Sequence, residues 1–318
     1  MKKLLVIAVA TALIAPAAAM ADTTLYGKVH ATVGNVETVT KGVETSETVV
    51  ESHDSRFGIK GSTSLDNGLS ATYGLELDVN LDEKGTVGAN RNKFVGLKGG
   101  FGEIRVGTHD TPGKLATAGL DAFGDTYGDM KNIISSDGDR VNNVVAYINK
   151  FGPVGFAAAH STNVGGDDAT TAENAANTLM ANYSTGPFYG ALGVTAIDDT
   201  AETTKANIGL GYKSEAGHFV NYVSEGVVKD GTPAADDEAN VYLAGGFKIG
   251  AATLKGAVGV GERDGAGEET QATLGVDYSL GKKTSAYLLL NDNTNIGRVA
   301  TGTEDSKSAA VVGLVSEF

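Results

Sequence analysis

Apolar and polar residues alternate along most of the chain with a period of two. The clearest segment is 69–79, in which Leu, Ala, Tyr and Val alternate with Ser, Thr, Gly and acidic residues. The segments 270–280, 205–212 and 253–260 repeat the pattern. Because successive side chains of a strand point to opposite faces, this pattern predicts β-strands with one apolar and one polar face.

Sixteen such segments can be placed along the chain. Short connections that contain Gly, Pro or Asn alternate with longer polar ones, including 35–53, 81–89 and 110–139. Short connections of this composition are typical of turns between neighbouring antiparallel strands. We expect strands near 23–34, 54–64, 69–80, 90–99, 102–109, 140–150, 154–162, 177–185, 188–197, 203–213, 217–225, 238–248, 252–263, 268–280, 283–292 and 306–318.

Two kinds of all-β protein fit this alternation. A soluble sandwich has one wet and one apolar face per strand, and so does a barrel that spans an outer membrane. Short turns on one side and long loops on the other favour the barrel, as does a polar face that stays wet along nearly every strand. The sequence therefore predicts an all-β fold, a transmembrane antiparallel barrel of sixteen strands.

The first 21 residues have the pattern of a secretory signal peptide. Lys2 and Lys3 precede an apolar run from Leu4 to Ile14, and Ala19-Met20-Ala21 is a small-x-small cleavage site. The alternative is a membrane-anchoring helix, but the run is short for one. We expect residues 1–21 to be removed and residues 22–318 to form one barrel domain.

Composition excludes several classes of protein. The chain has no Cys, so it has neither a disulfide framework nor a thiolate metal site. It carries 25 Lys and Arg against 39 Asp and Glu, which argues against nucleic-acid binding. The five His show no metal-ligand or protease spacing, and no nucleophile elbow or phosphate-binding loop is present. We expect no catalytic activity and no cofactor.

Acidic pairs fall near the long connections, at Asp167-Asp168, Asp198-Asp199, Asp236-Asp237-Glu238 and Glu268-Glu269. Such runs are ordinarily solvated surface. The alternative is loop-bound Ca²⁺ or Mg²⁺, because these hard cations prefer carboxylate oxygens.

The order of several motifs resembles the general diffusion porins of Gram-negative outer membranes. These motifs lie at 25–29 (LYGKV), 55–61 (SRFGIKG), 94–97 (FVGL), 100–107 (GFGEIRVG) and 140–147 (RVNNVVAY). The resemblance covers the whole chain after residue 21. It implies a homotrimer of sixteen-stranded barrels, a water-filled pore narrowed by a third loop folded inward at 110–139, and a terminal Phe318 that signals to the outer-membrane assembly machinery.

Alternation assigns side chains to the lumen. Phe57 and Ile59 should face lipid, which turns Arg56 inward, and Ile104 and Val106 likewise turn Arg105 inward. Arg91 and Lys93 share a face opposite Phe94, and Arg140 shares a face with Val144.

The resemblance gives a basic pore-wall role to Lys28, Arg56, Arg91 and Arg140, to which alternation adds Arg105. Opposite them we expect Asp121, Asp125 and Asp129 of the third loop. The loop sequence Asp-Ala-Phe-Gly-Asp at 121–125 departs from the family's Pro-Glu-Phe-Gly-Gly, which leaves its path open. Wall cations that face loop carboxylates would create a transverse field that selects among ions and polar solutes.

We therefore expect a passive outer-membrane channel for ions and small hydrophilic solutes. Removing Lys2 and Lys3 from the formal charge of −14 leaves 23 basic against 39 acidic residues, a net −16, which favours weak cation selectivity. Its expected partners are copies of itself, outer-membrane lipid and lipopolysaccharide, and the assembly machinery. The alternatives are a substrate-specific outer-membrane channel, or a secreted β-rich adhesin or structural protein.

Overall fold

The computed structural model describes residues 23–65, 67–82, 87–88, 91–165, 174–231, 237–264, 267–296 and 305–318. The predicted signal peptide at 1–21 lies outside these residues, as do Asp167, Asp168 and Asp236. Within the described ranges, no helix has both the length and the apolar character needed to cross a membrane.

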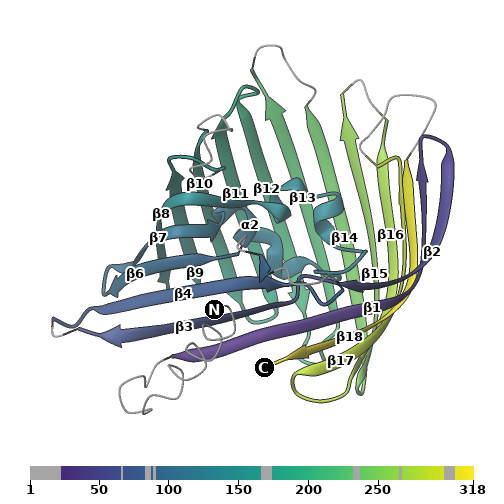
Figure 1. The fold of residues 1–318 in the computed structure, drawn as a ribbon. Coiled ribbons are helices and arrows are strands. Elements are labelled where there is room, and N and C mark those ends of the chain that lie inside the picture. Colours follow the sequence, from purple (N-terminus) through teal and green to yellow (C-terminus); the bar gives the residue numbers. More distant parts are fainter. Residues whose placement is uncertain are drawn as a thin grey trace, which may run out of the picture.

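The chain folds into a closed antiparallel β-barrel, in which the first strand pairs with the last (Figure 1). The strands are β1 (Thr24–Thr40), β2 (Val43–Ser52), β3 (Arg56–Ser64), β4 (Ser70–Val79), β5 (Val87–Gly88), β6 (Lys93–Gly99), β7 (Gly102–Asp110), β8 (Arg140–Phe151), β9 (Val154–Ser161), β10 (Ala175–Thr185), β11 (Phe188–Asp198), β12 (Thr203–Lys213), β13 (Phe219–Lys229), β14 (Glu238–Ile249), β15 (Ala252–Arg263), β16 (Glu269–Ser279), β17 (Thr284–Thr294) and β18 (Ser306–Glu317).

These eighteen segments occupy sixteen positions in the barrel wall. β2 and β3 both pair with β1, one beyond the other, so together they form one interrupted strand. β5 and β6 share β4 in the same way. The prediction of an antiparallel barrel of sixteen strands is confirmed.

The alternation of the sequence sorts side chains between the outer surface and the lumen. In β17, Leu288 and Leu290 are each 50% exposed on the outside, whereas Tyr287 and Leu289 are buried inside. Outward-facing Leu and Val recur in this way around the barrel. An apolar outer band is what a barrel needs in order to bury its strands in lipid.

The segment predicted as a loop at 35–53 is instead a hairpin. β1 continues to Thr40, and β2 returns from Val43 across the turn residues Lys41 and Gly42. Both turn residues have positive φ, 51° and 76°. Two-residue turns of this geometry match the twist of antiparallel strands, but Lys is rarely the residue that supplies them. The sequence prediction was therefore wrong about this loop.

The predicted strand at 90–99 begins only at Lys93, and its faces are reversed. Phe94 points into the lumen, where its ring lies 4.1 Å from the guanidinium carbon of Arg105. Lys93 pairs with Leu75, whose side chain is exposed on the outer surface. Arg91 lies in the interruption before β6, so the alternation that placed it beside Lys93 does not apply there.

A β-bulge corrects the prediction for Arg140. Gly107 pairs with Val144 but His109 pairs with Val141, so β8 carries one extra residue between these two pairs. Asn143 takes a left-handed conformation at this point, with φ of 51°. Because a bulge shifts the alternation by one residue, Val141 rather than Arg140 shares the face of Val144.

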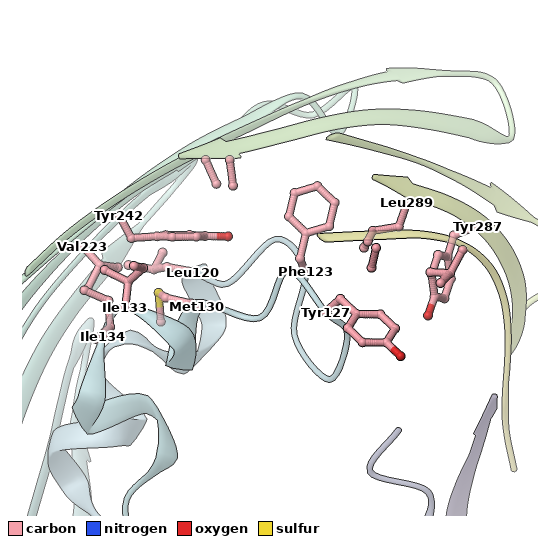
Figure 2. Packing of buried hydrophobic residues seen from close by; sticks show 14 of the residues in the cluster. Leu120, Phe123, Tyr127, Met130, Ile133, Ile134, Val223, Tyr242, Tyr287 and Leu289 are labelled. Carbon is pink, nitrogen blue, oxygen red and sulfur yellow. The ribbon is translucent and has the colours of Figure 1, made fainter. Parts of the chain in front are cut away.

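The segment between β7 and β8 folds into the barrel, and its short helices are α2 (Pro112–Thr117), η1 (Ala118–Leu120), η2 (Met130–Asn132) and η3 (Ser135–Gly138). We call residues 111–139 the inward loop. Its apolar side chains pack on the inner wall, as Figure 2 shows for Leu120, Met130 and Ile133 beside Tyr242. The main apolar cluster of the described residues therefore lies between the inward loop and one side of the wall.

Candidate functional site

Side chains of the barrel wall tether the inward loop at several points. Thr111 caps α2 by accepting a hydrogen bond from the Lys114 amide at 3.0 Å, and Pro112 suits the first turn. From the wall, Asn207 donates to the carbonyl of Gly113 at 2.9 Å. The carboxylate of Glu225 accepts the backbone N–H groups of both Ser135 and Ser136 at 2.8 Å. These bonds fix where the loop crosses the lumen.

Two wall glycines let α2 and η1 lie directly against the strands. A methyl group at Gly209 would come within 2.6 Å of the Leu120 side chain and 3.0 Å of that of Thr117. A methyl group at Gly193 would lie 3.0 Å from the Ala116 side chain. α2 and η1 are therefore seated on β10–β12, and the later part of the loop packs on β13–β16, as Ile133 does against Gly259 and Phe123 against Gly275.

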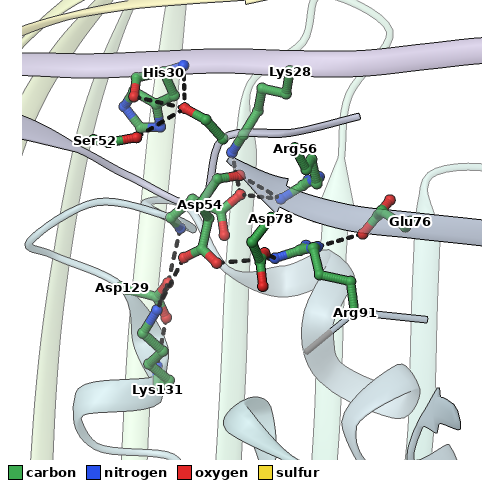
Figure 3. Close-up of polar contacts among 12 residues, drawn as sticks. Lys28, His30, Ser52, Asp54, Arg56, Glu76, Asp78, Arg91, Asp129 and Lys131 are labelled. Carbon is green, nitrogen blue, oxygen red and sulfur yellow. Dashed lines mark hydrogen bonds and ion pairs between the residues drawn. The ribbon is translucent and has the colours of Figure 1, made fainter. Parts of the chain in front are cut away.

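Asp125 is the loop carboxylate that reaches the opposite wall. It forms ion pairs with the Lys28 ammonium and, at 3.1 Å, with the Arg56 guanidinium (Figure 3). Burial alone would raise the pKa of Asp125, but the charges of Lys28 and Arg56 outweigh it and hold the pKa below its usual range. The structure thus brings together three of the residues that the sequence singled out.

Asp121 and Asp129 have different surroundings from Asp125. Asp121 is half-buried within the loop, where it accepts hydrogen bonds from the Phe123 amide at 2.8 Å, the Met130 amide at 3.1 Å and the Tyr242 hydroxyl at 3.1 Å. Asp129 accepts from the Asp125 amide at 2.8 Å and pairs with Lys131 at 3.3 Å. Both carboxylates shape the loop, so the sequence placed them correctly in the loop but not in contact with the wall cations.

Asp121, Asp129 and Asp137 form a carboxylate cluster, with one oxygen of each within 4.8 Å of the others; Asp129 and Asp137 are buried and Asp121 is half-buried. Burial, followed by the charge of Asp129, raises the pKa of Asp121 to about 7. Burial and the charges of Asp129 and Asp121 raise the pKa of Asp137 to about 8. Protons therefore neutralise part of this cluster near neutral pH.

A second set of charged side chains lies beside Asp125, and the sequence predicted only Arg91 among them. Arg91 pairs with Glu76 and lies 3.0 Å from Asp54 and 3.1 Å from Asp78. Asp54 also faces Lys131 of the inward loop at 3.5 Å (Figure 3). Asp54 lies in the interruption between β2 and β3 and has a positive φ of 47°. The run Ser-His-Asp-Ser at 52–55, where alternation stops, was the signal available.

The two remaining wall arginines lie in other surroundings. Arg105 pairs with Glu103 at 2.7 Å and lies against His109 and Phe94. Arg140 pairs with Asp110 at 2.9 Å and donates to Asn92 at 3.1 Å, at the point where the inward loop leaves the wall. These contacts brace β7 and β8 at the root of the loop.

The place where the inward loop meets the wall at Asp125, Lys28 and Arg56 is the constriction of the lumen, and both of its sides carry positive and negative side chains. The wall carries Asp54, Glu76 and Asp78 among its arginines, and the loop carries Lys131 among its carboxylates. Beside the Lys28–Asp125 pair lies a polar cavity of about 270 Å³, lined also by Arg56, Lys255 and Tyr287. Such a passage offers an ion or polar solute both signs of charge at close range.

Comparison with known proteins agrees with this architecture. Residues 6–297 match the sequence model described as "Gram-negative porin". The chain is 42% identical over 128 residues to the "Major outer membrane protein P.IB" of Neisseria gonorrhoeae, an alignment that covers 39% of this chain and 36% of that protein. It is 28% identical to the P.IB protein of Neisseria sicca over 359 residues, covering 99% and 98% of the two chains.

Solved structures show the same fold. The "Anion-selective porin from Comamonas acidovorans" superposes with a TM-score of 0.75 at 21% identity, covering 93% of this chain and 99% of that one. An in-vitro folded OmpT of Vibrio cholerae, described as a trimer form, superposes with a TM-score of 0.66 at 15% identity and covers the same shares.

Proposed function

This chain belongs to the Gram-negative porin family, and from that premise we propose that it forms an outer-membrane channel through which ions and small hydrophilic solutes diffuse passively. One observation carries the proposal. A loop folded into a closed barrel brings Asp125 onto Lys28 and Arg56 and leaves a polar, charge-lined cavity beside them. A polar lumen narrowed in this way passes hydrated solutes and selects by size and charge.

Planar-bilayer recording of the purified, folded protein tests the channel directly. We expect stepwise conductance in KCl that rises with salt concentration. A folded barrel that inserts into bilayers but passes no current would refute the proposal.

Weak cation selectivity is the second element of the proposal. Lys28, Arg56, Arg91, Arg105 and Arg140 each contact at least one carboxylate, so the constriction has no unpaired block of positive charge. The overall excess of Asp and Glu then sets the sign of the preference. The reversal potential in a KCl gradient should favour K⁺ slightly, and a clear chloride preference would overturn this element alone.

We further propose that the protein is exported by cleavage of a signal peptide at 1–21, assembles as a homotrimer in lipid and lipopolysaccharide, and engages the assembly machinery through Phe318. Phe318 exchanges backbone hydrogen bonds with Gly27 at 3.2 and 3.1 Å, where the barrel closes. A heat-modifiable trimer in the outer-membrane fraction, beginning at Asp22, would support these points. We expect neither catalysis nor a resident cofactor, and Ca²⁺ or Mg²⁺ at the acidic outer loops stays a prediction.

A further inference from the structure

A cavity of about 610 Å³ lies under the inward loop, at the end of the barrel where the strands are joined by short turns. Its walls include Pro187 and Gly217 of two of these turns and the loop residues Leu115 and Leu120. It shares Ala122, Lys255 and Asp277 with the smaller cavity beside Lys28 and Arg56. The two cavities therefore lie next to each other in the lumen.

Three lysines give the cavity a positive charge. Lys213 ends β12, Lys248 lies near the end of β14, and Lys255 lies near the start of β15, all on the inner face of the wall. Lys255 pairs with Asp277 at 2.7 Å. Among the described residues, Lys213 and Lys248 form no ion pair. The cavity is also lined by two carboxylates, Asp277 and the half-buried Asp121, which accepts hydrogen bonds from loop amides. Two ammonium groups are thus left to meet a bound anion.

The opposite side of the cavity is apolar. Leu115 of the inward loop and the rings of Tyr189 and Phe219 on the wall line it, whereas Leu120 beside them is only 4% exposed. The Tyr189 hydroxyl donates to the Ala116 carbonyl at 2.8 Å, which fixes its ring beneath the loop. Phe219 packs its ring over Gly246 of the neighbouring strand. Both rings are therefore held in place and present apolar surface before a ligand arrives.

We propose that this cavity binds organic anions that carry one acidic group on an apolar body of the size of one or two aromatic rings, such as aryl sulfonates and aryl carboxylates. The inference rests on the proposed channel function, because the cavity lies inside the lumen. Lys213 and Lys248 bind the acidic group, and Tyr189, Phe219 and Leu115 contact the body. The volume is within the range of small-molecule sites, and polar and apolar groups share the surface of the cavity, as a ligand with one acidic group on an apolar body requires.

Naphthalene-1-sulfonate is a suitable probe, with inorganic sulfate as the comparison anion. We expect isothermal titration of the detergent-purified barrel at low salt to show saturable naphthalene-1-sulfonate binding, at least about tenfold tighter than sulfate. The double variant Lys213→Gln/Lys248→Gln should weaken naphthalene-1-sulfonate binding about tenfold or more. Lys98→Gln/Lys150→Gln removes the same charge from strand ends on the other side of the barrel, and should leave the affinity unchanged.

A second variant tests the apolar half of the site. A side chain at Gly119 enters open space, since a methyl group there has no heavy atom within 4 Å. Gly119→Leu fills part of the cavity, so we expect it to weaken naphthalene-1-sulfonate binding while sulfate binding stays as it is. Equal loss for both anions, or no loss for either, would overturn the inference.

Different results would refute the proposed channel and the proposed binding site. Stepwise KCl conductance with no saturable naphthalene-1-sulfonate binding would overturn this inference and leave the proposed function intact. Binding by a barrel that never conducts would refute the proposed function instead. Binding that survives Lys213→Gln/Lys248→Gln unchanged would place the anion elsewhere and overturn the inference.

Discussion

Replacing Asp125 with Asn removes the one loop carboxylate that pairs with both Lys28 and Arg56. The amide keeps the shape of the side chain, so the change is mainly electrostatic. The group of Lys28, Arg56 and residue 125 becomes more positive by one charge. Asp125 has 27% of its side chain exposed, but its partner Lys28 has only 10%, so losing the carboxylate should cost about 1–3 kcal/mol of stability. The tethers from Asn207 and Glu225 remain, so the inward loop should stay in place.

The uncompensated positive charge also acts on permeating ions. An ion that passes about 5 Å from the uncompensated charge interacts with it by about 1 kcal/mol in a water-like medium, and by more in a lower dielectric. Screening in about 0.1 M salt leaves at least about half of that. About 0.5 kcal/mol changes a local concentration roughly twofold, in opposite directions for K⁺ and Cl⁻. The cation-to-anion permeability ratio should then fall about fivefold.

Reversal potentials in a KCl gradient centred near about 0.1 M measure this ratio, and the shift should shrink near about 1 M, where screening is stronger. Glu44→Gln is the matched control, since it makes the same change of charge on the exposed β1–β2 hairpin. Equal shifts in Asp125→Asn and Glu44→Gln would refute the reasoning, as would no shift in Asp125→Asn. A melting temperature within a few degrees of the wild type would confirm that the loop has kept its place.

Three further changes test the loop itself. The pKa values of Asp121 and Asp137 are raised to about 7 and 8, so the folded loop binds more protons than the unfolded chain, and the stability of the protein should fall as pH rises from about 5 to 9. Asp137→Asn should make the melting temperature depend less on pH. The same dependence in variant and wild type would contradict this. Gly209→Ala should lift η1 off the wall, cost about 1–3 kcal/mol and increase open-channel noise, whereas Gly226→Ala, where a methyl group meets no atom within 4 Å, should do neither. Glu225→Ala leaves two backbone N–H groups of η3 without their acceptor and should destabilise the loop by about 2 kcal/mol or more. Protease should then cleave the loop faster than in the wild type, and equal cleavage rates would count against the tether.

The barrel was predictable because lipid and water impose a strict alternation on every strand. Along β7, this alternation turned Ile104 and Val106 outward, where they are 43% and 46% exposed, and Arg105 inward. The inward position of Arg56 followed in the same way, and the structure places it beside Asp125. Resemblance to a family supplied the inward path of the segment 110–139, which no local pattern revealed.

The errors fall where alternation is interrupted. Lys41 in a left-handed turn hid the β1–β2 hairpin, and the bulge at Asn143 reversed the face expected for Arg140. The break before β6 misplaced Phe94, and the break before β3 hid Asp54. Three of these irregularities, those at Asp54, Arg91 and Asn143, lie beside the constriction or at the root of the loop. Local exceptions to a regular pattern are expected where side chains are positioned for function.

The pairing of β1 with β18 bears on how the molecule can be made. Lys28 lies opposite Glu317, so the seam of the cylinder joins segments separated by nearly the whole chain. Until the last strand is in place, a partial sheet has two open edges whose N–H and C=O groups have no partner. Contacts of such long sequence separation form slowly, and a half-built sheet is prone to aggregate. Synthesis must therefore be finished before the cylinder can close, and shielding of the chain until that moment is a requirement of its topology.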